Sequence, residues 1–145
     1  PNTIPWDTKA AGLYMICTLS KHEAEKQGYT DSLMLDHEGY VAEATGANIF
    51  FKDKDGTLHT PIPDSFLDGI TRRTVIEIAN SMNIKVNERK IKPDELKNFV
   101  GCFLTGTAAE VTPVSQIDKF NYKVCNTIIQ LSESYQQTVR KKKAA

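Results

Sequence analysis

Short apolar segments separated by turn residues fill the first half of the chain, and this pattern most constrains its fold. The segments are residues 32–36, 40–44, 49–52 and 57–60. His37-Glu38-Gly39 separates the first two, and Asp55-Gly56 separates the last two. Turn residues between such segments predict two β-hairpins. Pro61 and Pro63 then predict a loop, because proline interrupts a ladder of backbone hydrogen bonds.

Helical periodicity marks three other stretches, residues 8–27, 70–82 and 126–139. We expect Asp7 or Thr8 to cap the first helix and Asn126 to cap the last. The expected inward face of the first helix comprises Leu13, Ile16, Cys17 and Ala24. Further strands are predicted at residues 85–91, 100–104 and 112–117, with a helical turn from Pro93. Alternating strands and helices with several hairpins predict one mixed α/β domain over residues 1–145, not a purely parallel sheet.

The composition excludes several classes of function. The 145 residues include 18 basic and 18 acidic side chains, so nothing favours nucleic acid or an acidic membrane as partner. No apolar run approaches the roughly 18 residues of a membrane span. The three cysteines are odd in number and far apart in apolar surroundings, which favours reduced, buried thiols in a cytoplasmic protein. Because Lys9 stands so near Pro1, we also expect a longer parent polypeptide.

Lys9 and Glu43 are residue types that could hold pyridoxal 5'-phosphate. This cofactor needs a lysine amine for covalent attachment, a carboxylate for its ring nitrogen and N–H donors for its phosphate. A lysine such as Lys9 is, by itself, usually a solvated surface residue. Glu43 interrupts the apolar strand end Val41–Ala44 and must point to solvent or have a buried partner. Strand alternation alone slightly favours the outward orientation.

Two glycine-containing segments could supply the phosphate donors. Gly69-Ile70-Thr71 precedes the predicted second helix, whose first N–H groups and threonine hydroxyl would suit an anion. Most such helix starts, however, are only caps. Thr105-Gly106-Thr107-Ala108-Ala109 follows a predicted buried strand, and its small residues allow close approach of a ligand or of another chain segment. The sequence favours neither alternative.

Other polar residues give weaker signals. His22, His37 and His59 lack the spacing of metal ligands, so we expect surface residues and no metal site. Arg72 and Arg73 could meet an anion, although one of them should face solvent. The basic segment Arg140-Lys141-Lys142-Lys143 suits a helix end and a frayed tail, not a nucleic-acid site.

Taken together, these motifs resemble the class IV (fold-type IV) pyridoxal-phosphate aminotransferases, and most of all the branched-chain amino acid aminotransferases. The most specific segments are Glu43-Ala-Thr-Gly-Ala-Asn-Ile-Phe50, Leu67-Asp-Gly-Ile-Thr-Arg72 and Gly106-Thr-Ala-Ala-Glu110. The resemblance runs from Thr8 to Val114. It implies the large C-terminal domain of this fold, a mixed sheet curled into a pseudo-barrel with flanking helices.

The resemblance implies roles for individual residues. Lys9 matches the lysine that binds the cofactor and shuttles a proton during the reaction. Glu43 matches the carboxylate on the ring nitrogen, which reverses the local preference for an outward orientation. Tyr14 matches a hydrogen-bond donor to the ring oxygen, and Leu67 matches the residue on the ring face. The implied phosphate cradle comprises Gly69, Ile70, Thr71, Gly106 and Thr107; the implied substrate contacts are Tyr14, Thr107 and Ala108.

The implied reaction transfers the amino group of leucine, isoleucine or valine to 2-oxoglutarate, giving branched 2-oxo acids and glutamate. D-amino acid transaminase and aminodeoxychorismate lyase share the fold and remain alternatives. Family members also carry a smaller N-terminal domain, which this chain lacks, and form homodimers or higher homo-oligomers. An isolated domain that folds but performs no chemistry is therefore a further alternative.

Overall fold

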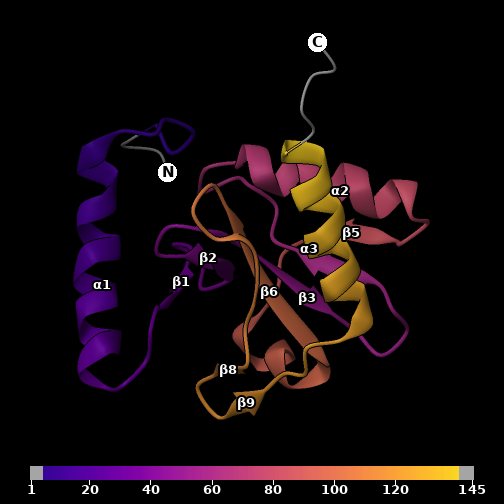
Figure 1. Cartoon of the computed structure of the whole chain (residues 1–145). Helices are drawn as coiled ribbons and strands as arrows, with labels where there is room; N and C mark the ends of the chain where they lie inside the picture. Colours follow the sequence, from indigo (N-terminus) through magenta and orange to yellow (C-terminus); the bar gives the residue numbers. More distant parts are fainter. Residues whose placement is uncertain (1–4, 141–145) are drawn as a thin grey trace.

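A five-stranded mixed sheet forms the centre of the structure, a computed structural model that describes residues 5–140 (Figure 1). Its strands are β3 (Asn48–Lys52), β4 (Leu58–Thr60), β5 (Val86–Glu88), β6 (Gly101–Gly106) and β7 (Glu110–Pro113). Their order is β5-β4-β3-β6-β7; β4 and β5 run parallel, and the other neighbours run antiparallel. Helix α2 (Ile70–Ser81) supplies the crossover that a parallel pair requires.

Two small hairpins accompany this sheet. β1 (Leu33–Leu35) pairs with β2 (Val41–Ala44), and β8 (Gln116–Ile117) pairs with β9 (Phe120–Asn121). The chain passes from β2 to β3 through a tight turn in which the Ala44 N–H donates to the Ala47 carbonyl at 2.8 Å. The mixed α/β class is confirmed. The described strands form no closed sheet, however, so the expected curling into a pseudo-barrel is not confirmed.

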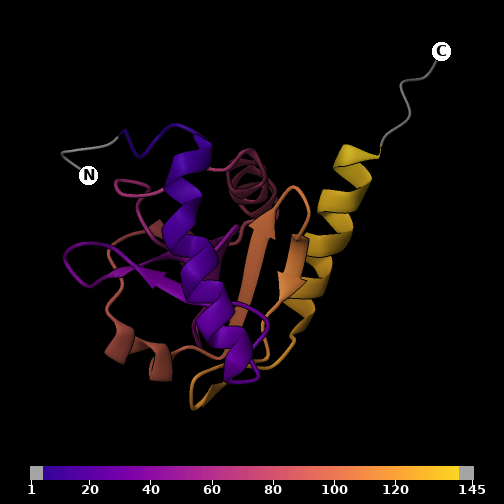
Figure 2. The same ribbon diagram turned by 90° about the vertical axis from the view of Figure 1, so that its left-hand side faces the viewer.

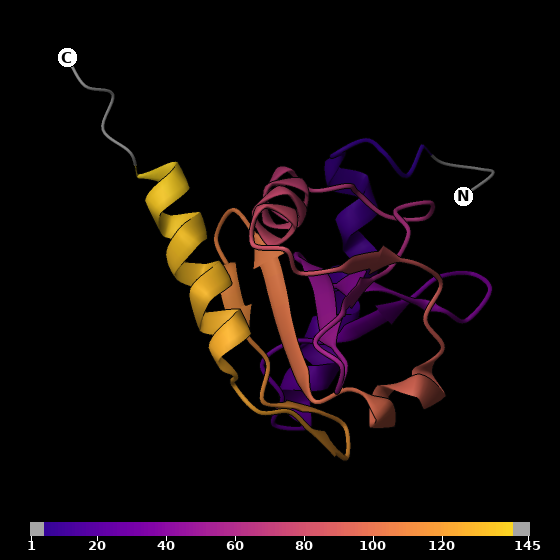
Figure 3. The ribbon, with the colours of Figure 1, turned by 90° about the vertical axis from the view of Figure 1, so that its right-hand side faces the viewer.

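The three helices lie on opposite sides of the sheet. α2 and α3 (Asn126–Val139) cover one face, whereas η1 (Ala11–Tyr14) and α1 (Met15–Lys26) lie on the other side (Figures 2 and 3). The core under α2 and α3 includes Phe50 and Phe103, whose rings stack at 4.9 Å. On the opposite face, Phe51 stacks on Phe99 after the helical turn η2 (Pro93–Asn98). Alternation along β3 thus supplies both cores.

Helix α1 differs from the other two because it contains no buried residue. Leu13, Cys17 and Ala24 are half-buried, but Ile16 is 64% exposed, so the expected inward face is wrong at that position. Met15 and Leu19 are 70% and 69% exposed. An apolar face of α1 therefore lies open within the described chain.

Several element boundaries differ from those expected. The Thr8 hydroxyl donates to the Pro5 carbonyl at 2.8 Å and does not cap a helix, which begins only at Ala11. Cys125, not Asn126, is the N-cap residue of α3. The strand expected over residues 112–117 is divided between β7 and β8, and that over residues 85–91 shortens to β5.

The cysteines and histidines show one further difference from expectation. Cys102 is buried, Cys17 and Cys125 are half-buried, and all three thiols are free. His59 is not a surface residue: its side chain is 11% exposed and its Nε2 lies 2.9 Å from Asp53 Oδ2.

Within residues 5–140, no helix is long and apolar enough to cross a membrane, and no group of three potential metal ligands occurs. Positions 141–143 of the basic segment lie outside the described residues.

Candidate functional site

Three of the predicted site residues line one cavity of about 220 Å³ between α1, β2 and the loop before α2. Tyr14 comes from the end of η1, Glu43 from β2 and Leu67 from the loop. Trp6 and Cys17 also line this cavity. Residues separated by more than 50 positions in the sequence are therefore brought together.

Glu43 places a largely buried carboxyl group in this cavity. Its carboxyl is largely buried, and burial raises its pKa from 4.5 to about 7. Burial, followed by the nearby Glu43 charge, also raises the pKa of the Tyr14 hydroxyl. No ion pair to Glu43 occurs among residues 5–140; the Asn48 amide donates to its Oε2 at 3.2 Å. A buried carboxylate without a cation is costly, so this site would favour a ligand carrying a positive N–H group.

Asn48 connects Glu43 to the start of α2. Its amide nitrogen donates to the Leu67 carbonyl at 2.9 Å as well as to Glu43, and its Oδ1 accepts from the Gly69 N–H at 3.2 Å. The side chain is buried. A Cβ added at Gly69 would lie 2.4 Å from Asn48 Oδ1, so only glycine fits there without displacing this amide. Sequence reasoning missed Asn48, although an asparagine at the start of an apolar strand was a usable signal.

The start of α2 leaves its first backbone N–H groups without a side-chain cap. Arg73 N–H makes the first intrahelical bond, to the Gly69 carbonyl, so the amides of Ile70 and Thr71 are available to an anion. The buried Thr71 hydroxyl lies 3.3 Å from the Tyr135 hydroxyl. When Tyr135 donates in this pair, the Thr71 O–H stays available for a ligand.

The turn between β6 and β7 lies beside the turn between β2 and β3. Gly106 closely approaches Gly46 and Ala47, where an added Cβ would lie 3.5 Å from the Gly46 carbonyl oxygen. Thr105 pairs with Asn48 across β3 and β6, so both side chains lie on one face of the sheet. The Thr105 hydroxyl is buried and has no hydrogen-bond partner among the described residues. Thr105 belongs to a segment predicted from the sequence as a possible phosphate site, but no role was predicted for its hydroxyl.

Other predicted residues are less enclosed. Lys9 is exposed and does not line the cavity, although its neighbour Thr8 does. Thr107 and Ala108 are exposed in the β6–β7 turn, and Ile70 is also exposed. The structure thus brings together Tyr14, Glu43 and Leu67, but leaves one side of the candidate site open.

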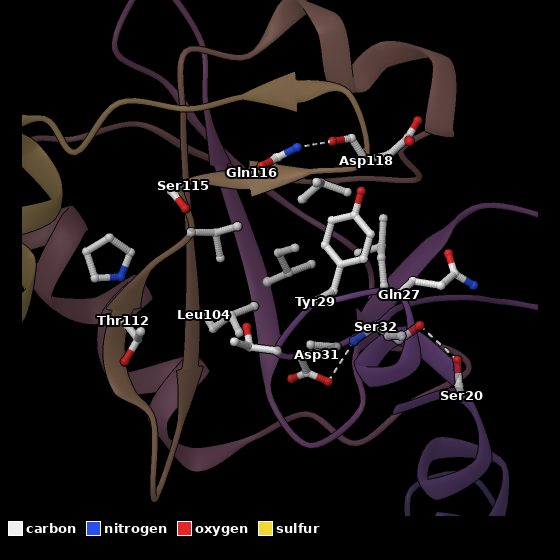
Figure 4. Close-up of a pocket in the computed structure, with 18 of the residues that line it drawn as sticks. Ser20, Gln27, Tyr29, Asp31, Ser32, Leu104, Thr112, Ser115, Gln116 and Asp118 are labelled. Atoms are coloured by element: carbon white, nitrogen blue, oxygen red, sulfur yellow. Dashed lines mark hydrogen bonds between the residues drawn. The ribbon is translucent and has the colours of Figure 1, made fainter. Parts of the chain in front are cut away.

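A larger cavity of about 520 Å³ contains none of the predicted site residues. It lies between the C-terminal part of α1 and the sheet. Figure 4 shows Ser20 and Gln27 on one side, Thr112 and Ser115 on the other, and the Tyr29 ring between them. The larger cavity is therefore not the candidate site, which is the smaller cavity lined by Tyr14, Glu43 and Leu67.

The sequence matches the family described as Amino-transferase class IV over residues 4–117. A probable branched-chain-amino-acid aminotransferase of Rickettsia felis is 50% identical over 124 residues, covering 86% of this chain and 42% of that protein. The branched-chain-amino-acid aminotransferase of Escherichia coli is 42% identical over 119 residues, covering 81% and 38%.

A solved structure resembles the fold described above. The branched-chain amino acid aminotransferase of Thermobaculum terrenum, in its PLP-bound holo form, superimposes with a TM-score of 0.90 at 37% identity. The match covers 95% of this chain and 46% of that chain. The chain thus spans about half the length, or less, of the proteins it matches.

Proposed function

Because this chain belongs to the class IV aminotransferase family, we propose that it is the cofactor-binding part of a branched-chain amino acid aminotransferase. The complete enzyme would transfer the amino group of leucine, isoleucine or valine to 2-oxoglutarate. Pyridoxal 5'-phosphate, when bound, supplies the electron sink that such a transfer requires. The substrates are therefore small amino acids and 2-oxo acids.

The observation that carries this proposal is Glu43, a largely buried carboxyl whose pKa is raised to about 7. A protonated ring nitrogen would supply the positive N–H group that this carboxylate lacks. The free amides of Ile70 and Thr71 begin only three residues after Leu67, which lines the Glu43 cavity. The donors therefore suit a ligand with a cationic ring and an anionic phosphate.

We propose the roles that the family resemblance implies, three of them for residues that line the cavity. Glu43 would hold the ring N–H, Tyr14 would donate to the ring oxygen and Leu67 would pack against the ring. The Lys9 amine would attach the cofactor and move a proton to and from the substrate. The remaining contacts are backbone and hydroxyl donors: Gly69, Ile70, Thr71, Gly106 and Thr107 for the phosphate, and Thr107 and Ala108 for the substrate carboxylate.

Reductive trapping tests this proposal. The chain is incubated with pyridoxal phosphate, reduced with borohydride and digested, and the labelled peptide is identified by mass spectrometry. We expect the label on Lys9 and none in Lys9→Ala. Label on other lysines, or undiminished label in Lys9→Ala, would refute the proposal.

A substrate panel tests the reaction class. We expect the complete enzyme to use leucine in preference to D-alanine and aminodeoxychorismate; preference for either of the latter would favour the D-amino acid transaminase or the lyase. The same leucine assay on residues 1–145 alone tests the alternative of an inactive isolated domain. Turnover equal to that of the complete enzyme would rule that alternative out.

We also propose that the complete enzyme contains a second, smaller domain and works as a cytoplasmic homodimer or larger homo-oligomer. Coverage of only about half of each matched protein supports the additional domain. The open apolar face of α1, with Met15, Ile16 and Leu19, supports burial against further protein. Sedimentation of the complete enzyme as a stable monomer would contradict the assembly.

A further inference from the structure

Arg72 is almost fully buried, at 1% exposure, in the first turn of α2. A guanidinium cannot lose its charge inside a protein, so burial requires several acceptors. Two are carboxylates: Nη1 donates to Asp68 Oδ1 at 2.8 Å, and Nη2 donates to Glu88 Oε2 at 2.6 Å. Nη2 also donates to the Pro61 carbonyl at 2.9 Å, and Nε lies 3.4 Å from Thr60 Oγ1.

These acceptors lie at both ends of the connection between β4 and α2. Pro61 is the first residue after β4, and Asp68 lies two residues before α2 begins. Glu88 is the last residue of β5 and pairs in register with Thr60. One guanidinium therefore closes the loop of residues 61–69 and fastens it to the parallel pair β4–β5.

The loop so closed carries groups of the candidate site. Its Leu67 lines the Glu43 cavity, and both its Leu67 carbonyl and its Gly69 N–H bond to Asn48. Arg72 itself is occupied by two carboxylates, so it is not a free cation for a ligand. The expectation that one of the two arginines meets an anionic group and the other faces solvent is confirmed: the anionic groups at Arg72 are the protein's own carboxylates, and Arg73 is the exposed member of the pair.

We propose that Arg72 is a positioning residue that holds the 61–69 loop so that the first amides of α2 bind the cofactor phosphate. This inference rests on the proposed function, in which pyridoxal phosphate occupies the site. Arg72 acts through the loop, so its loss should weaken recognition of the phosphate more than attachment of the ring.

Paired affinity measurements test this role. Binding of pyridoxal phosphate and of pyridoxal, which lacks the phosphate, is titrated by borohydride trapping on Lys9. We expect Arg72→Met to weaken pyridoxal phosphate about ten-fold but pyridoxal less than about three-fold. Arg73→Met is the matched control, because its exposed guanidinium lies 3.6 Å from Asp68 and reaches no acceptor in the loop beyond that carboxylate. In Arg73→Met, the ratio of the affinity for pyridoxal phosphate to that for pyridoxal should equal the wild-type ratio.

A conservative variant separates charge from geometry. Arg72→Lys keeps the positive charge but lacks the planar guanidinium. Its preference for pyridoxal phosphate over pyridoxal should therefore lie between those of Arg72→Met and wild type. In the ligand-free chain, Arg72→Met should also speed hydrogen exchange at the Gly69 amide, which donates to Asn48. Equal weakening of both ligands, or unchanged exchange at this amide, would overturn the proposal.

Two further outcomes are distinguishable. If wild-type protein attaches neither ligand at Lys9, the proposed function fails, and the role of Arg72 fails with it. If Arg72→Met does not fold, the same two affinities are measured in Glu88→Gln. This replacement is milder, because the Glu88 side chain is 47% exposed and the other acceptors of Arg72 stay in place. Glu88→Gln should lower the affinity ratio about three-fold; an unchanged ratio would overturn the proposal.

Discussion

Replacement of Glu43 by glutamine should change how the stability of the ligand-free protein depends on pH. In the folded protein the Glu43 carboxyl has a pKa of about 7, whereas in the unfolded chain its pKa is near 4.5. Between these values the folded state binds one more proton than the unfolded state. The free energy of unfolding therefore falls as the pH rises, because an unpaired carboxylate must then be buried. Glutamine cannot ionise, so Glu43→Gln removes this contribution.

The two pKa values give the magnitude. A pKa raised from 4.5 to about 7 corresponds to about 3 kcal/mol, at about 1.4 kcal/mol for each pH unit. The penalty is absent below about pH 4.5 and complete above about pH 7. Asp53 and Glu95 have lowered pKa values and act in the opposite sense at lower pH, but their contributions are shared by wild type and variant.

Urea denaturation followed by circular dichroism measures the effect. The variant should match wild type near pH 4.5 and exceed its free energy of unfolding by about 3 kcal/mol near pH 8. Glu133→Gln, on an exposed part of α3, is the control and should show no such divergence. A constant difference between Glu43→Gln and wild type across this range would refute the inference that Glu43 is buried without a cation.

Three other replacements test the packing of the site and core by their free energies of unfolding. Asn48→Ala should cost about 3 kcal/mol, because it removes three hydrogen bonds of about 1 kcal/mol each; a cost below about 1 kcal/mol would contradict its linking role. Gly69→Ala should cost about 1–3 kcal/mol through the contact with Asn48. Gly12→Ala, which meets nothing within 4 Å, should stay within about 0.5 kcal/mol, and equal effects of the two would refute the steric argument. Leu131→Ala should cost about 3 kcal/mol in the core under α2 and α3, whereas exposed Ile129→Ala in the same helix should cost less than about 1 kcal/mol.

Periodicity predicted the fold best where local pattern and packing agree. Helix α2 begins at Ile70 as expected, because Val75 and Ala79 recur at helical spacing and are buried. The prediction of one strand over residues 112–117 was wrong. The Val114 N–H still donates to the Cys102 carbonyl of β6, whereas residues 116–117 pair with β9 in a separate hairpin. Strand partners beyond a hairpin depend on long-range packing, which a local window does not contain.

The structure brings together three residues that the motifs singled out, because Tyr14, Glu43 and Leu67 line one cavity. Their roles toward a cofactor stay predictions. The linking roles of Asn48 and Arg72 were not predicted, because their hydrogen-bond partners are distant in sequence. The Asn48 bond to Gly69 spans 21 residues, and the Arg72 bond to Glu88 spans 16.

The contact between Thr71 and Tyr135 has a consequence for the order in which the start of α2 is completed. These residues are 64 positions apart, and Tyr135 belongs to the last helix of the described chain. Because a ribosome releases the chain from its N-terminus, the partners of Arg72, which extend only to Glu88, emerge well before Tyr135. The Thr71 hydroxyl would therefore gain its partner only after α3 has been made. If the proposed cofactor binds at this turn, its capture should follow synthesis of α3.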